Sequence, residues 1–427
     1  MNNVIHIIGG GLAGLSCAIK LLKNKNKKKI ILYESSNLFG GRCRSYIDKD
    51  FGCSLDNGNH LIIKAYKNTF KYLKEIGSTN TLITNKKSFY PFIDIKKLES
   101  WVVKPYSNIL PWWILFSASR PLDVSLLDFL KSFKLAFAKK YQTVSDLINK
   151  DSLIYKRFWE PFTIAALNTH PKEASAKLLW KVVRKTSFFY NNPLQPFIAK
   201  KSLDESLIKP GIDTILEEGG YIKANYRLKK INFENNSAKK IIFQNQTILI
   251  KNKDIVILTV PPNTLNKILP NIIIPKKTNC IINIYFSLDK IKNEINLPKN
   301  SFFLGVIGGV TDWIFKKDNI LSVTISAANN LNKYNNKSIS EMVWNEIVRI
   351  FKLNKDSMPK YKIIREKMAT FVQSPKEIFR KPKMFTKYSN IFLAGDWIDN
   401  GLPATIEGAI TSGYNVAKYI NNNTNEN

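Results

Sequence analysis

The sequence contains little cysteine and little histidine. Among 427 residues there are four cysteines and three histidines, and the cysteines form no CxxC pair and no cluster flanked by histidine. A disulfide scaffold and a structural zinc site both need such clusters, so the sequence argues against both and we expect no metal site. Scattered free cysteines are typical of a reducing compartment, which indicates a cytoplasmic protein.

Long uncharged runs are also scarce. The longest internal one covers residues 105–119, which is shorter than the ~20 residues that cross a bilayer. Residues 1–19 are uncharged too, but they include four glycines and no basic region precedes them. We therefore expect neither a secretory signal nor a membrane span.

Acidic residues are half as frequent as basic ones. Asp and Glu number 33 against 65 Lys and Arg, which gives a net charge of +32. The lysines occur in every segment, without interleaved stacking aromatics and without a nucleic-acid-binding signature. We attribute the charge to a compositional drift and expect no nucleic-acid partner, but such a charge attracts the chain to an anionic inner-membrane surface.

The N-terminus has the pattern of a βαβ unit. An apolar strand is predicted over residues 4–8, a helix over 12–22 and a second buried strand over 30–33. Between the first strand and the helix lies G-x-G-x-x-G, formed by Gly9, Gly11 and Gly14, and Glu34 ends the second strand. This context predicts a dinucleotide site, with pyrophosphate at the helix N-terminus and Glu34 on a ribose; the alternative is an ordinary glycine turn.

The rest of the chain alternates between helical and strand patterns. Helices are predicted over 65–76, 125–140, 152–168, 171–185, 339–353 and 405–420, and strands over parts of 220–260 and over 280–288, 321–327 and 390–394. Because a Rossmann half opens the chain and a strand-Gly-Asp-helix unit closes it, we expect one discontinuous nucleotide domain with an insertion. The predicted nucleotide domain is 1–85, 205–270 and 385–427, and the predicted substrate domain is 86–204 and 271–384.

Two further motifs resemble the FAD-dependent amine oxidase and phytoene desaturase superfamily. One is Gly40-Gly41-Arg42, and the other is Phe392–Trp397 followed by Pro403–Ala409. The resemblance implies non-covalent FAD, held by Gly41 and by Arg42 against its phosphates. It also implies that Asp396 bonds the ribityl chain or pyrophosphate, and that the N–H groups near Thr405 and Ile406 face the flavin.

Motifs in the middle of the chain are similar to those of hydroxysqualene dehydroxylases, FAD-dependent proteins of bacterial hopanoid pathways. The resemblance covers residues 3–420, and its most specific motifs are Asp56–His60, Phe158–Phe162 with Ala166–Asn168, and Arg365–Phe371. It implies an α/β fold, a Rossmann-type FAD-binding domain with an inserted α+β substrate domain. The implied reaction is the FAD-dependent reductive removal of the hydroxyl group of hydroxysqualene to give squalene.

This reaction implies several partners. The substrate is an apolar C30 isoprenoid, so the resemblance implies a peripheral position on the inner membrane. The sequence contains no second G-x-G-x-x-G in a βαβ setting, so an external donor, NAD(P)H or a reductase, must reduce the FAD. The alternatives are a phytoene desaturase-type or other amine-oxidase-family flavoenzyme, and a basic lipid-binding or nucleic-acid-binding protein with a vestigial nucleotide fold.

Three features have two interpretations each. His60 is either a proton donor near the flavin, which makes it our catalytic candidate, or a structural residue that fixes the loop around it. Glu160 is either a buried acid with a raised pKa or a solvated helix residue. The cluster Trp112–Phe116 either lines a lipid tunnel or dips into a membrane, or it belongs to the core.

Overall fold

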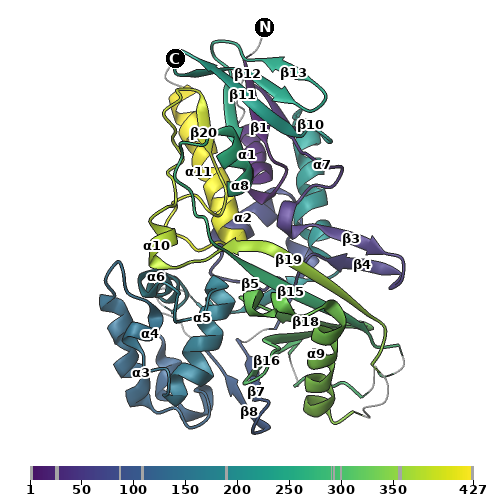
Figure 1. The fold of residues 1–427 in the computed structure, drawn as a ribbon, viewed down its shortest axis with the longest axis vertical. Helices are drawn as coiled ribbons and strands as arrows, with labels where there is room; N and C mark the ends of the chain where they lie inside the picture. The colour runs from purple at the N-terminus through teal and green to yellow at the C-terminus, as the bar shows by residue number, and fades with distance from the viewer. Residues whose placement is uncertain are drawn as a thin grey trace.

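The computed structural model of the chain describes residues 3–24, 28–85, 88–106, 110–187, 191–289, 291, 294–298, 301–353 and 358–424. The molecule is elongated, and both termini lie at the upper end in Figure 1. The upper end combines the first and last segments of the chain with a middle segment around β10–β14, and the lower end is built from the segments between them.

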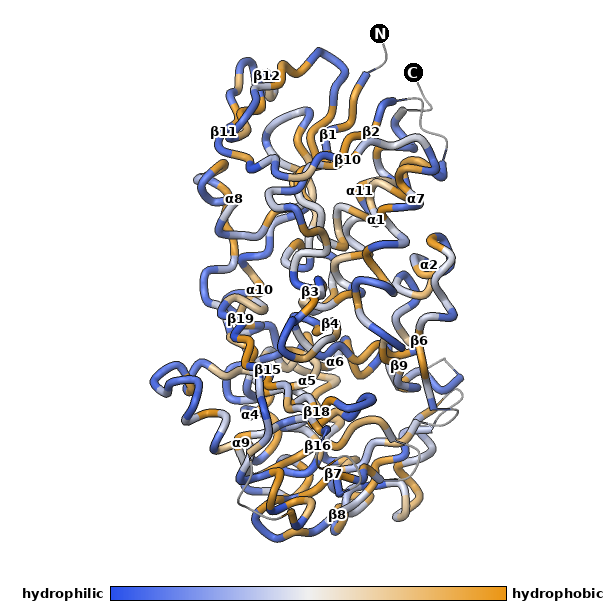
Figure 2. Tube along the Cα trace, turned by 90° about the vertical axis from the view of Figure 1, so that its right-hand side faces the viewer, coloured by the Kyte–Doolittle hydropathy of each residue, from blue (hydrophilic) through white to orange (hydrophobic). Residues whose placement is uncertain are grey.

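A parallel sheet forms the centre of the upper end. Its strand order is β10–β2–β1–β14–β20, and every neighbouring pair is parallel. Apolar residues run along these strands, as Figure 2 shows for β1, because both faces of the sheet are covered. The strands are β1 (Val4–Ile8), β2 (Lys29–Tyr33), β10 (Tyr221–Lys223), β14 (Ile255–Leu258) and β20 (Ile391–Leu393).

Helices cover one face of this sheet, and a small antiparallel sheet with one helix covers the other. The helices of the first face are α1 (Leu12–Lys23), α2 (Lys67–Glu75), α7 (Lys209–Glu217) and α11 (Ile406–Thr424). The second face packs against β11 (Leu228–Glu234), β12 (Ser237–Phe243), β13 (Thr247–Leu249) and α8 (Pro262–Ile268). The two cores meet at the parallel sheet, which fixes the positions of the loops at its strand ends.

A second, larger sheet lies in the lower half. Its order is β19–β15–β18–β17–β16–β7–β8, antiparallel except for the pair β16–β7. One face packs against α9 (Asn336–Phe351) in an apolar core. The strands are β7 (Tyr90–Asp94), β8 (Glu99–Val103), β15 (Thr278–Ser287), β16 (Phe303–Ile307), β17 (Trp313–Lys317), β18 (Ile320–Ile325) and β19 (Tyr361–Phe371).

A group of short helices packs beside this sheet, at the lower left of Figure 1. Most of these helices share an aromatic-rich core with β7 and β8. We call this set the helical group. It comprises η3 (Trp112–Leu115), η4 (Ser117–Ser119), α3 (Leu126–Ser132), η5 (Phe133–Phe137), α4 (Val144–Leu147), the π-helical η6 (Tyr155–Trp159), α5 (Glu160–Leu167) and α6 (Ala176–Ser187).

Small elements connect the two halves. The hairpin β3–β4 and the antiparallel sheet β5–β9–β6 lie between them. The bounds of these strands are β3 (Ser45–Asp48), β4 (Cys53–Asp56), β5 (Ile62–Ile63), β6 (Leu82–Thr84) and β9 (Pro196–Ala199). The remaining short helices of the structure are η1 (Gly41–Cys43), η2 (Thr79–Thr81), η7 (Asp204–Ile208), η8 (Ala328–Lys333) and α10 (Pro375–Ile378).

The predicted α/β fold class with a parallel Rossmann-type sheet is confirmed by this architecture and by the solved structures reported below. The sequence patterns did not predict β16, β17 or β19 as strands. The domain boundaries proposed above stay a prediction. Among the described helices, none combines the length and the apolar character that a bilayer crossing requires.

Candidate cofactor site and active site

The glycine loop between β1 and α1 is tightly packed at two of its three predicted positions. Gly9 has a φ of +121°, and a Cβ there would lie 2.6 Å from Thr259 Oγ1. A Cβ on Gly14 would lie 2.0 Å from the carbonyl oxygen of Gly9. Both positions therefore need glycine to form the turn and bring the helix onto the strand.

Gly11 differs from its neighbours because the space beside it is open. A Cβ on Gly11 would meet no heavy atom within 4 Å, and its φ of −79° is ordinary. Gly11 is the N-cap of α1 and offers no side-chain cap to the first N–H groups of the helix. The open space at an uncapped helix N-terminus fits a phosphate group of a dinucleotide.

Glu34 is fixed beside this loop. Its Oε2 accepts a hydrogen bond of 2.8 Å from the Gly10 N–H, and its Oε1 accepts one of 3.1 Å from the Ser36 N–H. The carboxylate is therefore held where β2 ends, next to the glycine loop. This position suits the predicted contact with a ribose diol.

The Gly-Gly-Arg turn packs against the glycine loop and reaches the C-terminal motif. The Gly40 N–H donates to the Gly10 carbonyl over 2.8 Å, and Gly41 has a φ of +58°. The Arg42 guanidinium donates to Asp396 Oδ1 over 2.7 Å and also to the Ala369 carbonyl. The negative charge of Asp396 raises the pKa of Arg42.

The C-terminal motif is anchored to α1 through α11. The Gly395 N–H donates to Ser412 Oγ over 3.0 Å, and Thr405 Oγ1 accepts a hydrogen bond of 3.1 Å from the Gly408 N–H. Ile406 is buried in the core that contains α1. A Cβ on Gly413 would lie 2.3 Å from the Ala13 carbonyl, a close approach that the sequence motifs did not indicate. The structure thus brings α11 against α1.

The residues predicted to hold FAD therefore occupy one region of the upper half. Hydrogen bonds link the glycine loop to Glu34 and to the Gly-Gly-Arg turn, and the Arg42–Asp396 pair links that turn to the C-terminal motif. The open cradle at Gly11 and the uncapped N-terminus of α1 fit FAD. The individual roles of these residues toward FAD stay predictions.

The loop at residues 56–60 is held to the lower sheet by its asparagines. Asn57 Nδ2 donates to Glu366 Oε2 on β19 over 3.1 Å, and Asn59 Nδ2 donates to Thr324 Oγ1 on β18 over 3.0 Å. This loop follows β4 and joins the Gly-Gly-Arg region to the face of the lower sheet opposite α9. It therefore stands between the candidate cofactor site and the lower half.

His60 ends this loop without anchoring it. No hydrogen bond joins its imidazole to another residue in the described part of the chain, whereas its neighbours form several. Burial, together with the positive charge of Arg42, lowers the pKa of His60 to about 4. The imidazole is thus neutral at pH 7 and available to a ligand, and the hydrogen bonds that fix the loop come from the asparagines.

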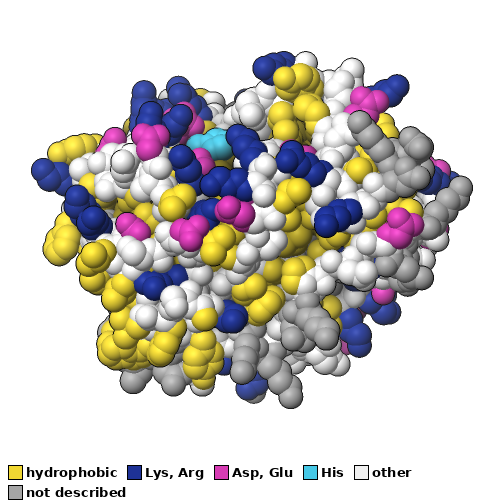
Figure 3. Space-filling view, turned by 90° about the horizontal axis from the view of Figure 1, so that it is seen from below, with side chains coloured by type: hydrophobic (Ala, Val, Ile, Leu, Met, Phe, Trp, Pro, Cys, Tyr) yellow, Lys and Arg dark blue, Asp and Glu magenta, His cyan; other side chains and the backbone are white. Residues whose placement is uncertain are grey.

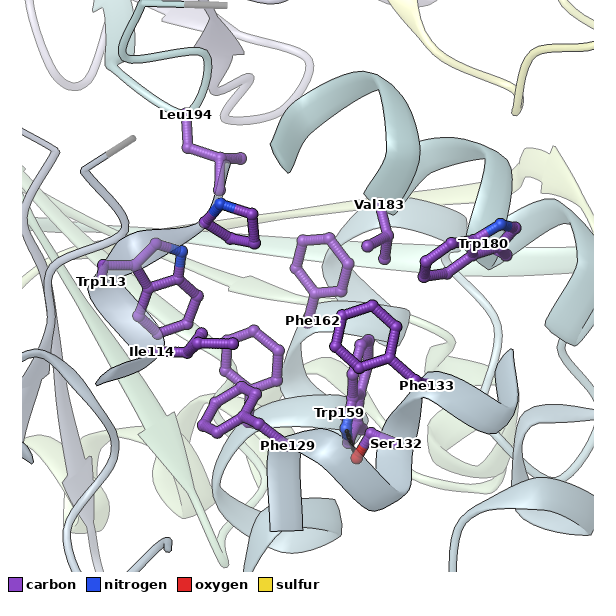
Figure 4. A pocket seen from close by; sticks show the side chains of 12 residues that line it. Trp113, Ile114, Phe129, Ser132, Phe133, Trp159, Phe162, Trp180, Val183 and Leu194 are labelled. Carbon is purple, nitrogen blue, oxygen red and sulfur yellow. Dashed lines mark hydrogen bonds between the residues drawn. The ribbon is translucent and has the colours of Figure 1, made fainter. Parts of the chain in front are cut away.

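An apolar pocket lies within the helical group. Aromatic rings converge on it from several helices (Figure 4), and seven of its twelve lining residues are aromatic. The cluster at 112–116 is divided: Trp113 and Ile114 line the pocket, whereas Trp112, Leu115 and Phe116 are exposed. The aromatic lining residues are Trp113, Phe129, Phe133, Phe158, Trp159, Phe162 and Trp180.

Further aromatic side chains connect the region of this pocket to the loop at His60. Trp313 belongs to the same core as the pocket residues, and its ring centroid lies 5.7 Å from that of Phe303. Phe303 and Trp313 share an apolar cluster with Leu61, the neighbour of His60. An apolar environment therefore continues from the pocket to the predicted catalytic loop.

Two acids near the helical group have perturbed pKa values. Burial raises the pKa of Glu160 on α5, and burial raises the pKa of Asp312, in the turn before β17, to about 7. Asp312 Oδ2 accepts a hydrogen bond of 2.6 Å from the Ser326 N–H. The sequence singled out Glu160, but it gave no sign of Asp312, because its burial depends on the pairing of β16, β17 and β18.

Asp312 predicts a pH dependence of stability. Its pKa is higher in the folded state than in an unfolded chain, so its contribution to stability is complete below pH ~4 and is lost as the pH rises through about 7. We expect Asp312→Asn, which cannot ionise, to gain about 2 kcal/mol relative to wild type between pH 5 and pH 8. Urea unfolding of both proteins with excess FAD measures this; an equal difference at both pH values would contradict it.

Comparison with known proteins identifies the class. The sequence profile of the flavin-containing amine oxidoreductases matches residues 12–421, so the chain belongs to this family. The predicted FAD cofactor and the predicted class, a flavin-dependent oxidoreductase, are thereby confirmed.

Within the family, the chain is a homologue of hydroxysqualene dehydroxylases. That of Zymomonas mobilis is 34% identical over 415 residues, which cover 97% of this chain and 98% of the relative. That of Rhodopseudomonas palustris is 32% identical over 421 residues, which cover 98% and 99%. Cyclohexylamine oxidase from Brevibacterium oxydans has the same fold, with a TM-score of 0.70 over 99% of both chains at 12% identity. The resemblance stated from the motifs is confirmed.

Proposed function

We propose that this protein removes the hydroxyl group of hydroxysqualene reductively to give squalene, in squalene and hopanoid biosynthesis. The full-length similarity to two proteins named hydroxysqualene dehydroxylase is the observation that carries the proposal. The aromatic lining of the pocket supports it, because a C30 hydrocarbon chain needs an apolar site from which water is excluded.

The reaction replaces a C–O bond by a C–H bond. The substrate alcohol takes up two electrons and two protons in total and releases water, and an external donor, NAD(P)H or a reductase, supplies the electrons. Reduced FAD, when bound, supplies the hydride. The protein must supply a proton to the leaving hydroxyl, because hydroxide is a poor leaving group, and aromatic faces that tolerate a developing allylic cation.

The candidate site residues divide between these tasks. We propose that Gly9, Gly11, Gly14, Glu34, Gly41, Arg42, Asp396 and the backbone at Thr405 and Ile406 bind FAD. We propose His60 as the proton donor, because it lies beside Arg42, has no partner within the described chain and adjoins the apolar cluster at Leu61. The pocket of the helical group would hold part of the hydrocarbon chain.

We further propose that the protein works peripherally on the inner face of the cytoplasmic membrane. Its substrate partitions into lipid, and its net charge of +32 attracts it to anionic lipid. The domain division at 1–85, 205–270 and 385–427 against 86–204 and 271–384 belongs to the same proposal. The parallel sheet, whose strands come from three separated segments, supports it.

Anaerobic turnover tests the reaction. We expect the FAD-loaded protein, with dithionite or a reductase as donor and detergent-dispersed hydroxysqualene, to form squalene in proportion to the electrons supplied. Gas chromatography of the extract measures the product. Protein without reductant is the control. If instead the oxidised enzyme forms new double bonds in a polyene substrate and leaves hydroxysqualene intact, the desaturase alternative replaces the proposal.

A further inference from the structure

The helical group carries a concentration of exposed large apolar side chains. In the view from below, apolar side chains gather on the left of the face, over this group, with basic side chains among them (Figure 3). Phe137 is 85% exposed and Phe116 is 63% exposed, and monomeric soluble proteins seldom expose a large apolar surface that is not a contact site. We define the apolar patch as Trp112, Leu115, Phe116, Leu127, Leu130 and Phe137.

The helices that form the apolar patch also form the pocket wall. Trp112 is exposed and its neighbour Trp113 lines the pocket; on α3, Leu130 is exposed and Phe129 lines it. Phe133 does both, since it is 38% exposed and also contributes to the lining. The pocket therefore lies directly behind the apolar patch, and whatever covers the patch also faces the pocket wall.

The charge around the apolar patch is positive, which favours an anionic partner. Residues 110–141 contain five basic residues (Arg120, Lys131, Lys134, Lys139 and Lys140) but only two acids, Asp123 and Asp128. Asp123 already forms an ion pair of 3.0 Å with Arg157. A second copy of the chain would bring the same positive charge and be repelled, whereas anionic lipid headgroups attract it.

We propose that the apolar patch docks the protein on an anionic lipid bilayer, with its aromatic and leucine side chains inserted below the headgroups and its lysines among them. The pocket wall then faces the hydrocarbon region, and an apolar ligand reaches the pocket without crossing water. The docking surface follows from the structure, whereas the identity of that ligand rests on the proposed function.

Vesicle flotation of the full-length FAD-loaded protein tests the apolar side chains. We expect the protein to float with vesicles of phosphatidylcholine and phosphatidylglycerol, and Phe116→Ser with Phe137→Ser to weaken binding at least about tenfold. The matched control is Ile47→Ser with Leu249→Ser, which removes two apolar side chains that are 81% and 69% exposed elsewhere. Equal loss in both double variants would overturn the proposal.

A charge-reversal pair separates the patch from the overall charge of the molecule. Lys139→Glu with Lys140→Glu changes the net charge as much as Lys229→Glu with Lys230→Glu, on β11 at the opposite end of the molecule. We expect the first pair to weaken vesicle binding about thirtyfold or more and the second pair to have a small effect. Equal effects would show that total charge alone drives binding, and the patch would have no special role.

Two further measurements distinguish the possible failures. We expect the Phe116/Phe137 variant to keep wild-type turnover of detergent-dispersed hydroxysqualene but to lose turnover of vesicle-borne hydroxysqualene. No turnover by wild type in detergent, with normal flotation, would refute the proposed function alone. Absent flotation, together with a dimer in sedimentation that the phenylalanine variant dissociates, would assign the patch to self-association and refute the docking proposal.

Discussion

His60→Ala is expected to retain FAD with an unchanged flavin spectrum and to lose turnover by roughly 10²–10⁴-fold, the usual contribution of a positioned acid. The structure explains why FAD binding and turnover should respond differently to this substitution. The imidazole forms no hydrogen bond within the described chain, and the asparagines at 57 and 59 fix the loop, so removal of the ring leaves the anchors intact. Single-turnover kinetics with pre-reduced enzyme measure the chemical step directly.

The pH profile extends this test. Because burial and Arg42 lower the pKa of His60 to about 4, a donor that acts as imidazolium would give a rate that rises as the pH falls toward 4. A rate that falls only above pH ~7 would match the pKa of Asp312 instead. The exposed His170 gives the control variant His170→Ala, which should keep normal turnover.

Two results for His60→Ala would contradict its assignment as the proton donor. If His60→Ala loses its flavin or fails to fold, the residue is structural. If it keeps near-normal turnover, the proton comes from elsewhere, and Glu160→Gln and Asp312→Asn are the next variants to assay, because burial raises the pKa of both acids.

The sequence was sufficient to predict the nucleotide-binding framework because that framework is local. The turn at Gly9, the close packing at Gly14 and the acid at the end of β2 all lie within one βαβ unit. The spacing of these residues in the sequence is therefore enough to predict how they are arranged in space. The meeting of Arg42 with Asp396 joins residues at opposite ends of the chain, and only the resemblance placed them in one site.

The lower sheet was harder to predict. β19 is an edge strand with Lys, Arg and Glu along it, a composition that protects an edge but gives no apolar run. β16 contains Gly305, where a Cβ would lie 2.4 Å from the Phe92 ring. Glycine is needed at this position because of Phe92, a residue far away in the sequence. The alternation of apolar and polar residues therefore could not identify β16 or β19 as strands.

The sequence could not predict which residues of the cluster at 112–116 are buried and which are exposed. A short 3₁₀ helix directs consecutive side chains to different sides, so Trp112 is exposed and Trp113 is buried although they are neighbours. Of the two interpretations offered for this cluster, the core describes Trp113, which is buried, whereas a contact with lipid stays a prediction for the exposed Trp112 and Phe116. Which residue belongs to which is decided by the packing of α3 against η3.

Gly14→Ala is expected to destabilise the protein itself. The new Cβ would lie 2.0 Å from the Gly9 carbonyl, a backbone atom that cannot move without opening the turn. We expect a loss of about 1–3 kcal/mol or more in the free energy of unfolding without added FAD, measured by urea. Wild-type stability would mean that the helix and strand can separate at this point at little cost.

Gly11→Ala is expected to do the opposite: to keep the fold and lose the cofactor. Nothing in the protein lies within 4 Å of the new methyl group and the φ of −79° suits alanine, so the unfolding free energy without FAD should stay within about 1 kcal/mol of wild type. The methyl group would occupy the space at the N-terminus of α1 that we assign to the pyrophosphate, and would block its hydrogen bonds to the backbone. Since each charge-assisted hydrogen bond contributes about 1.5–3 kcal/mol, FAD should bind roughly 10- to 100-fold more weakly. Fluorescence titration of the apoprotein with FAD measures this, and wild-type affinity in Gly11→Ala would place the pyrophosphate away from this glycine.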